Sequence, residues 1–202
     1  MFSGKYDHEK RSGAHAGFVD GCEVAQREYE VKALAEIVHA LYPLRLLEIG
    51  TYQGGTLAYW CRAAAEGAQI IGVDNRAADG LWARWMGPNE LRYHHLQMDS
   101  HEQQTRRIVE ELLDGEPLDF LFIDGDHTVE GVTKDFMLYG PLVRKGGVIA
   151  FHDILNPSPE RNQDHIRVSL LWKRIRNAGY MTRELIAHPD QTWGGIGVVY
   201  ID

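Results

Sequence analysis

Short apolar runs alternate along this chain with segments whose apolar residues recur at helical spacing, and this alternation restricts the fold more than any other feature. Strands of a parallel sheet are covered on both faces, so they appear as continuous apolar runs. Such runs, separated by helical segments, are typical of an α/β protein with a mostly parallel sheet. The strand-like runs occupy residues 44–49, 69–73, 91–98, 118–123, 148–151, 181–186 and 196–201.

The segments between these runs predict the helices and the direction of the last strands. From Val24 to Tyr42 apolar side chains recur so that they share one face of a helix, and Pro43 ends it. The same spacing predicts helices over 128–144 and 167–178. The connection between the last two runs has no room for a crossover helix, so these two strands should be antiparallel.

The length of 202 residues predicts one domain, since about 150 residues per domain is usual. An apolar content of 44% and a charged content of 25% are ordinary for a globular protein and exclude a disordered chain. Residues 1–22 are rich in Gly and His and show no apolar period. We therefore expect a mobile N-terminal arm over 1–22 and a single domain over 23–202.

The charge and the cysteine content restrict the partners and the compartment. With 21 Lys and Arg against 29 Asp and Glu, the net charge is −8, which argues against nucleic acid as a partner. No apolar stretch reaches the ~18 residues of a membrane span, and the N-terminus lacks the apolar core of a signal peptide. Cys22 and Cys61 make no disulfide framework, so a cytoplasmic location and no membrane contact are expected.

A Gly-rich turn, EIGTYQGGT at residues 48–56, follows the first strand-like run. Glycine suits a tight strand-to-helix turn that approaches a ligand, and the N–H groups at the next helix start favour a negatively charged group. A dinucleotide fingerprint would have its second glycine where this chain has Tyr52, so the pattern disfavours NAD. By itself the turn is equally typical of any α/β protein.

Polar residues also follow the second and third runs. Asp74 and Asn75 end the second run, where an acid holds the ribose hydroxyls in nucleotide-binding folds. Asp99 and Ser100 follow the third run, where a polar side chain could meet the edge of an adenine. Each acid alone is more often a helix N-cap, but acids at three successive strand ends favour a nucleotide-like ligand.

Five ionisable residues follow the fourth and fifth runs, in the segments IDGDH and FHD. The carboxyl ends of parallel strands converge on one crevice, so these groups should crowd together. Three carboxylates repel one another unless a cation relieves the strain. Oxygen ligands suit magnesium or calcium, and an added imidazole would tolerate manganese, iron or zinc. The five residues are Asp124, Asp126, His127, His152 and Asp153.

These side chains also have plainer interpretations. Asp126 is placed where it could cap the helix predicted over 128–144, and His127 could be a surface histidine. His152 is as compatible with a packed histidine as with a metal ligand. The metal hypothesis therefore depends mainly on Asp124 and Asp153 together.

The chain resembles the class I S-adenosylmethionine-dependent methyltransferases over roughly residues 44–153. The stretch IDGDHTVEGVTKDFMLYGPLVRKGGVIAFHD closely resembles the subgroup with macrocin-type sugar O-methyltransferases and cephalosporin-hydroxylase-like proteins. The resemblance implies a Rossmann-like α/β fold whose seven-stranded sheet is mostly parallel, with an antiparallel last strand and helices on both faces. It also implies that S-adenosylmethionine is bound by Glu48, Gly50, Thr51, Tyr52, Gly54, Asp74, Asn75, Asp99, Ser100 and Asp124.

The resemblance further implies a metal site, with magnesium expected, and a catalytic base. The ligands carried over are Asp124 and Asp153, with His152 in the place of the first acid of a pair, so the third ligand and the metal identity stay open. The base would be Asp126 or His127. We favour His127 because its ordinary pKa lies near neutrality, with Asp126 orienting it.

The implied reaction moves a methyl group from S-adenosylmethionine to a hydroxyl of a small molecule, such as a sugar or a natural product. Coordination to a divalent metal lowers the pKa of that hydroxyl, and a base removes the proton. Two alternatives stay open: an oxidoreductase or hydroxylase-type enzyme, and a non-catalytic S-adenosylmethionine-binding partner subunit. The arm over 1–22 could close over the site or join copies in a homo-oligomer, and Trp193 could face the crevice.

Overall fold

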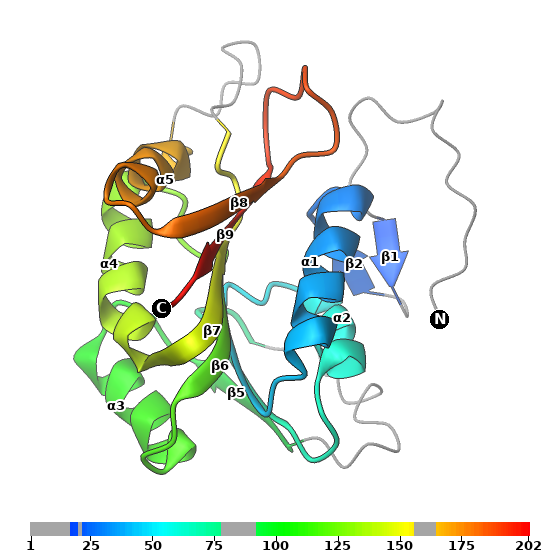
Figure 1. The fold of residues 1–202 in the computed structure, drawn as a ribbon. Helices are drawn as coiled ribbons and strands as arrows, with labels where there is room; N and C mark the ends of the chain where they lie inside the picture. The colour runs from blue at the N-terminus through cyan, green and yellow to red at the C-terminus, as the bar shows by residue number, and fades with distance from the viewer. Residues whose placement is uncertain (1–16, 20–21, 78–91, 156–164) are drawn as a thin grey trace.

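The computed structural model describes residues 17–19, 22–77, 92–155 and 165–202, which include a seven-stranded sheet (Figure 1). Its strands are β3 (Arg45–Ile49), β4 (Gln69–Asp74), β5 (Arg92–Gln97), β6 (Leu118–Ile123), β7 (Val143–Phe151), β8 (Met181–Leu185) and β9 (Ile196–Tyr200). They lie in the order β5-β4-β3-β6-β7-β9-β8. β9 is antiparallel to both of its neighbours, and the other pairs are parallel, which confirms the predicted Rossmann-like sheet.

Helices cover both faces of this sheet, as predicted. One face is covered by α1 (Glu28–Leu41) and α2 (Gly55–Ala63). The other face is covered by α3 (Gln103–Leu113), α4 (Val129–Tyr139) and α5 (Val168–Asn177), so that the sheet forms the middle layer (Figure 1).

Alternate residues of β6 explain why the strands appear as continuous apolar runs. Phe120 and Phe122 meet the ring of Trp60 from α2 edge-on, with ring centroids 5.1 and 5.5 Å apart. Leu121 and Ile123 point the other way, into the core beneath α3, α4 and α5. Because successive side chains of a strand point to opposite faces, a strand between two helical layers is apolar at most positions.

The element boundaries differ from the predicted ones at the first helix, at the helix predicted over 128–144 and at β7, which begins at Val143 rather than at residue 148. Val24 belongs to a two-stranded antiparallel sheet, β1 (Gly17–Val19) with β2 (Cys22–Val24), and the first helix begins only at Glu28. The predicted helix over 128–144 ends at Tyr139. Pro141 has no N–H to donate, so the α-helix does not continue through it. A short 3₁₀ turn, η2 (Gly140–Leu142), follows before β7.

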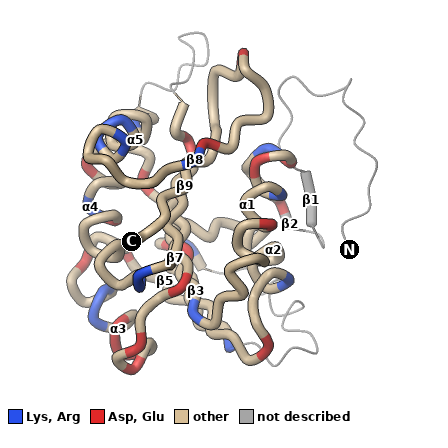
Figure 2. Tube along the Cα trace, viewed as in Figure 1, with Lys and Arg blue, Asp and Glu red and all other residues tan. Residues whose placement is uncertain are grey.

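Most of the proposed N-terminal arm lies outside the described residues, and its described part contributes β1 and the start of β2. Charged residues are concentrated on helices and loops rather than along the central strands (Figure 2). Among the described helices, none has the length and apolarity that a bilayer span requires. The carboxyl ends of β3, β4, β5, β6 and β7 lie at one edge of the sheet, and the candidate site is built there.

Candidate active site

A pocket of about 810 Å³ opens at the carboxyl ends of the parallel strands. Its size lies within the range of small-molecule sites. The structure brings twelve of the predicted site residues into its lining: Gly50, Thr51, Tyr52, Asp74, Asn75, Asp99, Ser100, Asp124, Asp126, His127, His152 and Asp153. Trp193 also lines the pocket, as expected, whereas Glu48 and Gly54 do not.

The turn after β3 passes so close to the next strand end that its first glycine leaves no room for a side chain. Gly50 has a φ of +86°, and a Cβ there would lie 2.1 Å from the carbonyl oxygen of Asp124. Two backbone hydrogen bonds connect the same strand ends. The Gly50 N–H donates to the carbonyl of Val73, and the Asp124 N–H donates to the carbonyl of Ile49, both at 2.8 Å. The Gly-rich turn after β3 and the acidic cluster are therefore in direct backbone contact.

Glu48, near the end of β3, is hydrogen-bonded to α2, the helix that follows this turn. Its side chain is 1% exposed and accepts hydrogen bonds from the Thr56 hydroxyl and, at 3.0 Å, from Trp60 Nε1, both on α2. Burial, with the charge of Asp124 nearby, raises the pKa of Glu48 to about 8. The Glu48 side chain thus connects β3 to α2 and does not line the pocket.

Asp74 is fixed at the end of β4 by two backbone donors. Its Oδ2 accepts from the N–H of Tyr52 and its Oδ1 from the N–H of Arg76, both at 2.8 Å. Tyr52 adopts the left-handed conformation, with φ at 46°, which turns its N–H toward Asp74. Each carboxylate oxygen keeps acceptor capacity for a ligand hydroxyl.

Asp99 and Ser100 line the pocket from the loop between β5 and α3. The Asp99 carboxylate accepts from the N–H of His101 at 2.8 Å, and its carbonyl accepts from the Thr105 hydroxyl at 2.6 Å. The carbonyl of Ser100 accepts from the Tyr139 hydroxyl of α4 at 2.7 Å. These bonds give the loop a defined shape at the pocket wall.

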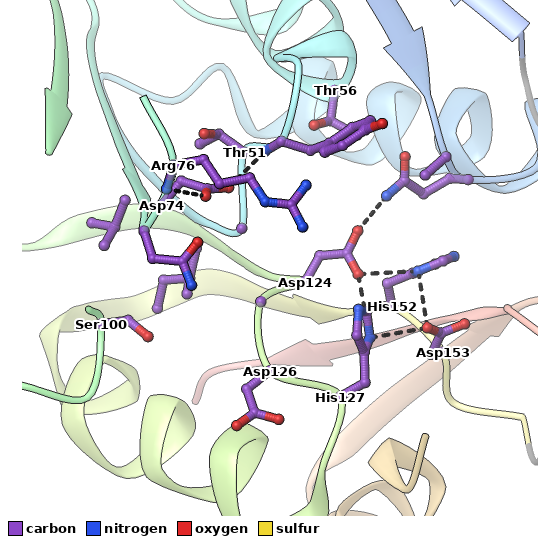
Figure 3. Close-up of a pocket in the computed structure, with 18 of the residues that line it drawn as sticks. Thr51, Thr56, Asp74, Arg76, Ser100, Asp124, Asp126, His127, His152 and Asp153 are labelled. Atoms are coloured by element: carbon purple, nitrogen blue, oxygen red, sulfur yellow. Dashed lines mark hydrogen bonds and ion pairs between the residues drawn. The ribbon is translucent and has the colours of Figure 1, made fainter. Parts of the chain in front are cut away.

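The acids and histidines after β6 and β7 converge on each other (Figure 3). His152 Nδ1 lies 3.1 Å from Asp124 Oδ1 and 3.6 Å from Asp153 Oδ2. His127 Nδ1 lies 3.0 Å from the same Asp153 oxygen and 4.0 Å from Asp124 Oδ1. Asp124, His152 and Asp153 each offer one ligand atom within 4.8 Å of the others, so they could hold a metal ion.

Two further properties of this cluster are unusual. Asp153 is a non-glycine residue with φ at 59°, a strained conformation of the kind that persists at functional sites. Burial opposes the charged form of both histidines, but the neighbouring carboxylates outweigh it. Asp153 and Asp124 raise the pKa of His152 to about 10 and also raise the pKa of His127. The two carboxylates of the cluster therefore favour positive charge beside them, whether a protonated imidazole or a cation.

Asp126 points into the pocket from the loop before α4, but it is engaged locally. Its Oδ1 accepts from the N–H of Thr128 at 2.8 Å, while Thr128 itself is the N-cap of α4 and accepts from Gly131. Although partial burial acts the other way, the bonds from Thr128 lower the pKa of Asp126. The helix-cap interpretation is thus wrong for Asp126 in detail, since Thr128 is the cap.

Gln26, just before α1, belongs to the site but was not predicted. It is 3% exposed, lines the pocket and donates from Nε2 to Asp124 Oδ2. Its Oε1 is buried without a hydrogen-bond partner among the described residues. Because Gln26 lies 98 positions before Asp124, no local sequence signal could have paired the two.

Glu30 of α1 was also missed, and it lies behind His152. The side chain is fully buried, accepts from the N–H of Gly195 at 3.1 Å and receives a second bond from Gln191. Arg27 stacks over the Trp193 ring at 4.2 Å, one turn away on the same segment. The start of α1 therefore holds the loop before β9, which forms one side of the pocket.

A family model described as a methyltransferase domain matches residues 47–154, more than half of the chain. The chain therefore belongs to the methyltransferase-domain family. Its sheet, with one antiparallel strand inserted between β7 and β8, is the class I fold of S-adenosylmethionine-dependent methyltransferases. These findings confirm the resemblance on which the sequence predictions were based.

One curated relative is similar to part of the chain. The chain is 32% identical over 117 residues to the uncharacterized protein R132 of Acanthamoeba polyphaga mimivirus, covering 54% of this chain and 51% of that protein. It therefore spans about half the length of this curated relative.

Solved structures show the likeness of the fold. An O-methyltransferase from Bacillus cereus in complex with SAH has a TM-score of 0.62 and 22% identity, covering 84% of this chain and 80% of that one. The MycE methyltransferase of the mycinamycin pathway, in complex with Mg, SAH and mycinamycin VI, has a TM-score of 0.57 and 17% identity, covering 84% and 48%. At these identities the similarity is one of fold alone.

Proposed function

We propose that this protein transfers a methyl group from S-adenosylmethionine to a hydroxyl of a small molecule, with a divalent cation at the acidic cluster. The observation that carries the proposal is the close approach of the Gly50 backbone to the Asp124 backbone. A Cβ added at Gly50 would lie only 2.1 Å from the carbonyl oxygen of Asp124. A donor seated on the turn after β3 would lie against the cluster that holds the acceptor. Such positioning contributes much of the rate of a group transfer.

The residues on the donor side fit S-adenosylmethionine. Asp74, oriented by the N–H groups of Tyr52 and Arg76, presents a carboxylate to the ribose hydroxyls. Gly55 and Thr56, at the N-terminus of α2, line the pocket and favour the carboxylate of the methionine part. Asp99 and Ser100 would border the adenine.

The donor set of Asp124, His152 and Asp153 fits a divalent cation, since two carboxylates and an imidazole face one another within 4.8 Å. These ligand types suit magnesium and also manganese, iron or zinc. The bound cation would supply the positive charge that lowers the pKa of the acceptor hydroxyl. MycE, a structural neighbour described with Mg and SAH, supports this assignment by analogy.

His127 is the better candidate for the base. Its Nδ1 faces Asp153 at 3.0 Å, which fixes the ring and leaves Nε2 as the nitrogen that can take the acceptor proton. Asp126 is held by Thr128, and its lowered pKa makes it a weaker base. We therefore assign the proton transfer to His127.

The two alternative functions have less support from the site. Tyr52 occupies the position of the second glycine of a dinucleotide fingerprint and adopts a left-handed conformation there, which disfavours NAD and hydride transfer. A purely non-catalytic subunit would have no need for a His127–Asp153 pair in the pocket wall.

The test is methyl transfer from isotopically labelled S-adenosylmethionine to a panel of hydroxylated small molecules, including sugars and glycosylated natural products. We expect labelled product with at least one acceptor class, and less product after metal removal with EDTA. Label transfer that is unaffected by EDTA would contradict the metal assignment alone. Donor binding without transfer to any acceptor would favour the non-catalytic alternative.

A further inference from the structure

A second histidine–acid cluster lies on the pocket wall, away from the proposed metal ligands. His101, in the loop between β5 and α3, lines the pocket. Its Nε2 lies 3.5 Å from Asp135 Oδ1 on α4, and its Nδ1 lies 3.7 Å from Asp99 Oδ1. Neither His101 nor Asp135 was predicted as a site residue.

Asp135 is the unusual member of this cluster. Its side chain is fully buried, and among the described residues neither carboxylate oxygen has a donor at good hydrogen-bonding geometry. Burying a carboxylate without donors costs several kcal/mol, so such a group needs a proton or a nearby cation. Burial raises the pKa of Asp135 to about 6, although Ser100 and His101 act against it.

The loop that carries His101 is attached to α4 at two points. The first is the hydrogen bond from the Tyr139 hydroxyl to the carbonyl of Ser100, at 2.7 Å. The second is the contact between His101 and Asp135, one helical turn before Tyr139. Asp99, at the other end of the loop, faces the second nitrogen of the His101 ring. The His101 side chain therefore contacts both Asp99 at the start of the loop and Asp135 on α4.

We infer that His101, placed between Asp99 and Asp135, holds the 99–101 loop in the shape that receives the nucleoside end of the cofactor. The inference rests on the proposed function, because it assigns that loop to the adenine. Among the described residues His101 Nε2 has no hydrogen-bond partner, so the ring acts through its position between the two carboxylates. His101 and Asp135 are positioning residues in this account.

The test measures binding of S-adenosylhomocysteine, which cannot react, by isothermal titration calorimetry. We expect the Asp135→Asn and His101→Gln variants each to raise the Kd about tenfold near pH 6.5, and the double variant to be no weaker than either. Glu130→Gln, an exposed acid on the same helix, is the matched control and should bind as the wild type does.

A lowered melting temperature with an unchanged Kd would show a merely structural pair and overturn the inference. If Asp135→Asn does not fold, His101→Gln decides the question, since its side chain is 20% exposed at the pocket wall. Tight wild-type binding that neither variant alters contradicts the inference alone. Failure of the wild type to bind S-adenosylhomocysteine at any pH contradicts the proposed function and the inference with it.

Discussion

The two sides of the pocket are built in different ways. The side after β3 is made by backbone: Gly50 and Gly54 have positive φ, and the Tyr52 N–H is aimed at Asp74. The side after β6 and β7 is made by side chains, with carboxylates and imidazoles within 4 Å of each other. The first side should therefore be sensitive to any added volume, and the second to any change of charge.

The largest effect is expected from adding a single methyl group to the turn after β3, the side of the pocket that is made by backbone. Gly50→Ala would place a Cβ 2.1 Å from the Asp124 carbonyl oxygen at a φ of +86°, so both sides of the site must shift. We expect loss of detectable cofactor binding and a stability loss of roughly 3 kcal/mol, measured by calorimetry and urea unfolding.

Gly67→Ala is the matched control for that variant. Gly67 also has a positive φ, +70°, but an added Cβ would meet no atom within 4 Å. It should cost only about 1–2 kcal/mol for the backbone and leave cofactor binding intact. If the two alanine variants behave alike, the close approach at Gly50 has no role.

The second prediction concerns the side-chain half of the site. His127→Ala should lower turnover by roughly 10²–10⁴-fold, because the group that takes the acceptor proton is gone, while the affinity for the donor changes little. Asp126→Asn is the comparison variant and should lose less than His127→Ala in the same assay. A larger loss at Asp126 would transfer the role of base to that carboxylate.

The third prediction changes charge without changing shape. Asp153→Asn keeps the size of the side chain but removes a negative charge 3.0 Å from His127 and 3.6 Å from His152. The concentration of Mg²⁺ that restores activity after EDTA treatment should rise about 10- to 100-fold. An unchanged metal requirement would mean that the cation, if one acts, is held elsewhere.

The last prediction concerns the pH dependence of stability and returns to the backbone side. The pKa of Glu48 is about 8 in the native state and near 4.5 when unfolded. Between these values the native state holds the extra proton, so the free energy of unfolding falls as the pH rises, by at most about 1.4 kcal/mol per pH unit. Glu48→Gln should remove this slope in urea titrations at about pH 5 and about pH 9, and an equal slope in both proteins would contradict the assignment.

Local patterns predicted most of the scaffold. The seven predicted runs correspond to the seven strands of the sheet, because the central strands between two helical layers are mostly apolar. The predicted acids after β4, β5, β6 and β7 reach the pocket, since strand ends converge by topology alone. Side-chain direction was not predictable: Glu48 turns under α2, which depends on Thr56 and Trp60 folding over it.

The missed residues share a physical cause. Gln26 meets Asp124 across 98 positions, and Glu30 meets Gly195 across 165. Neither lies at a strand end or in a motif, and their roles arise only when α1 packs beside the last strands. His101 is similar, because its partner Asp135 looks in sequence like an ordinary polar helix residue.

The most direct test of the account is a calorimetric titration of the wild-type protein with S-adenosylmethionine and, separately, with NAD. The account predicts one-to-one binding of S-adenosylmethionine with Kd in roughly the micromolar range, weakened by Asp74→Ala, and no comparable binding of NAD. Tight binding of NAD without binding of S-adenosylmethionine would contradict it.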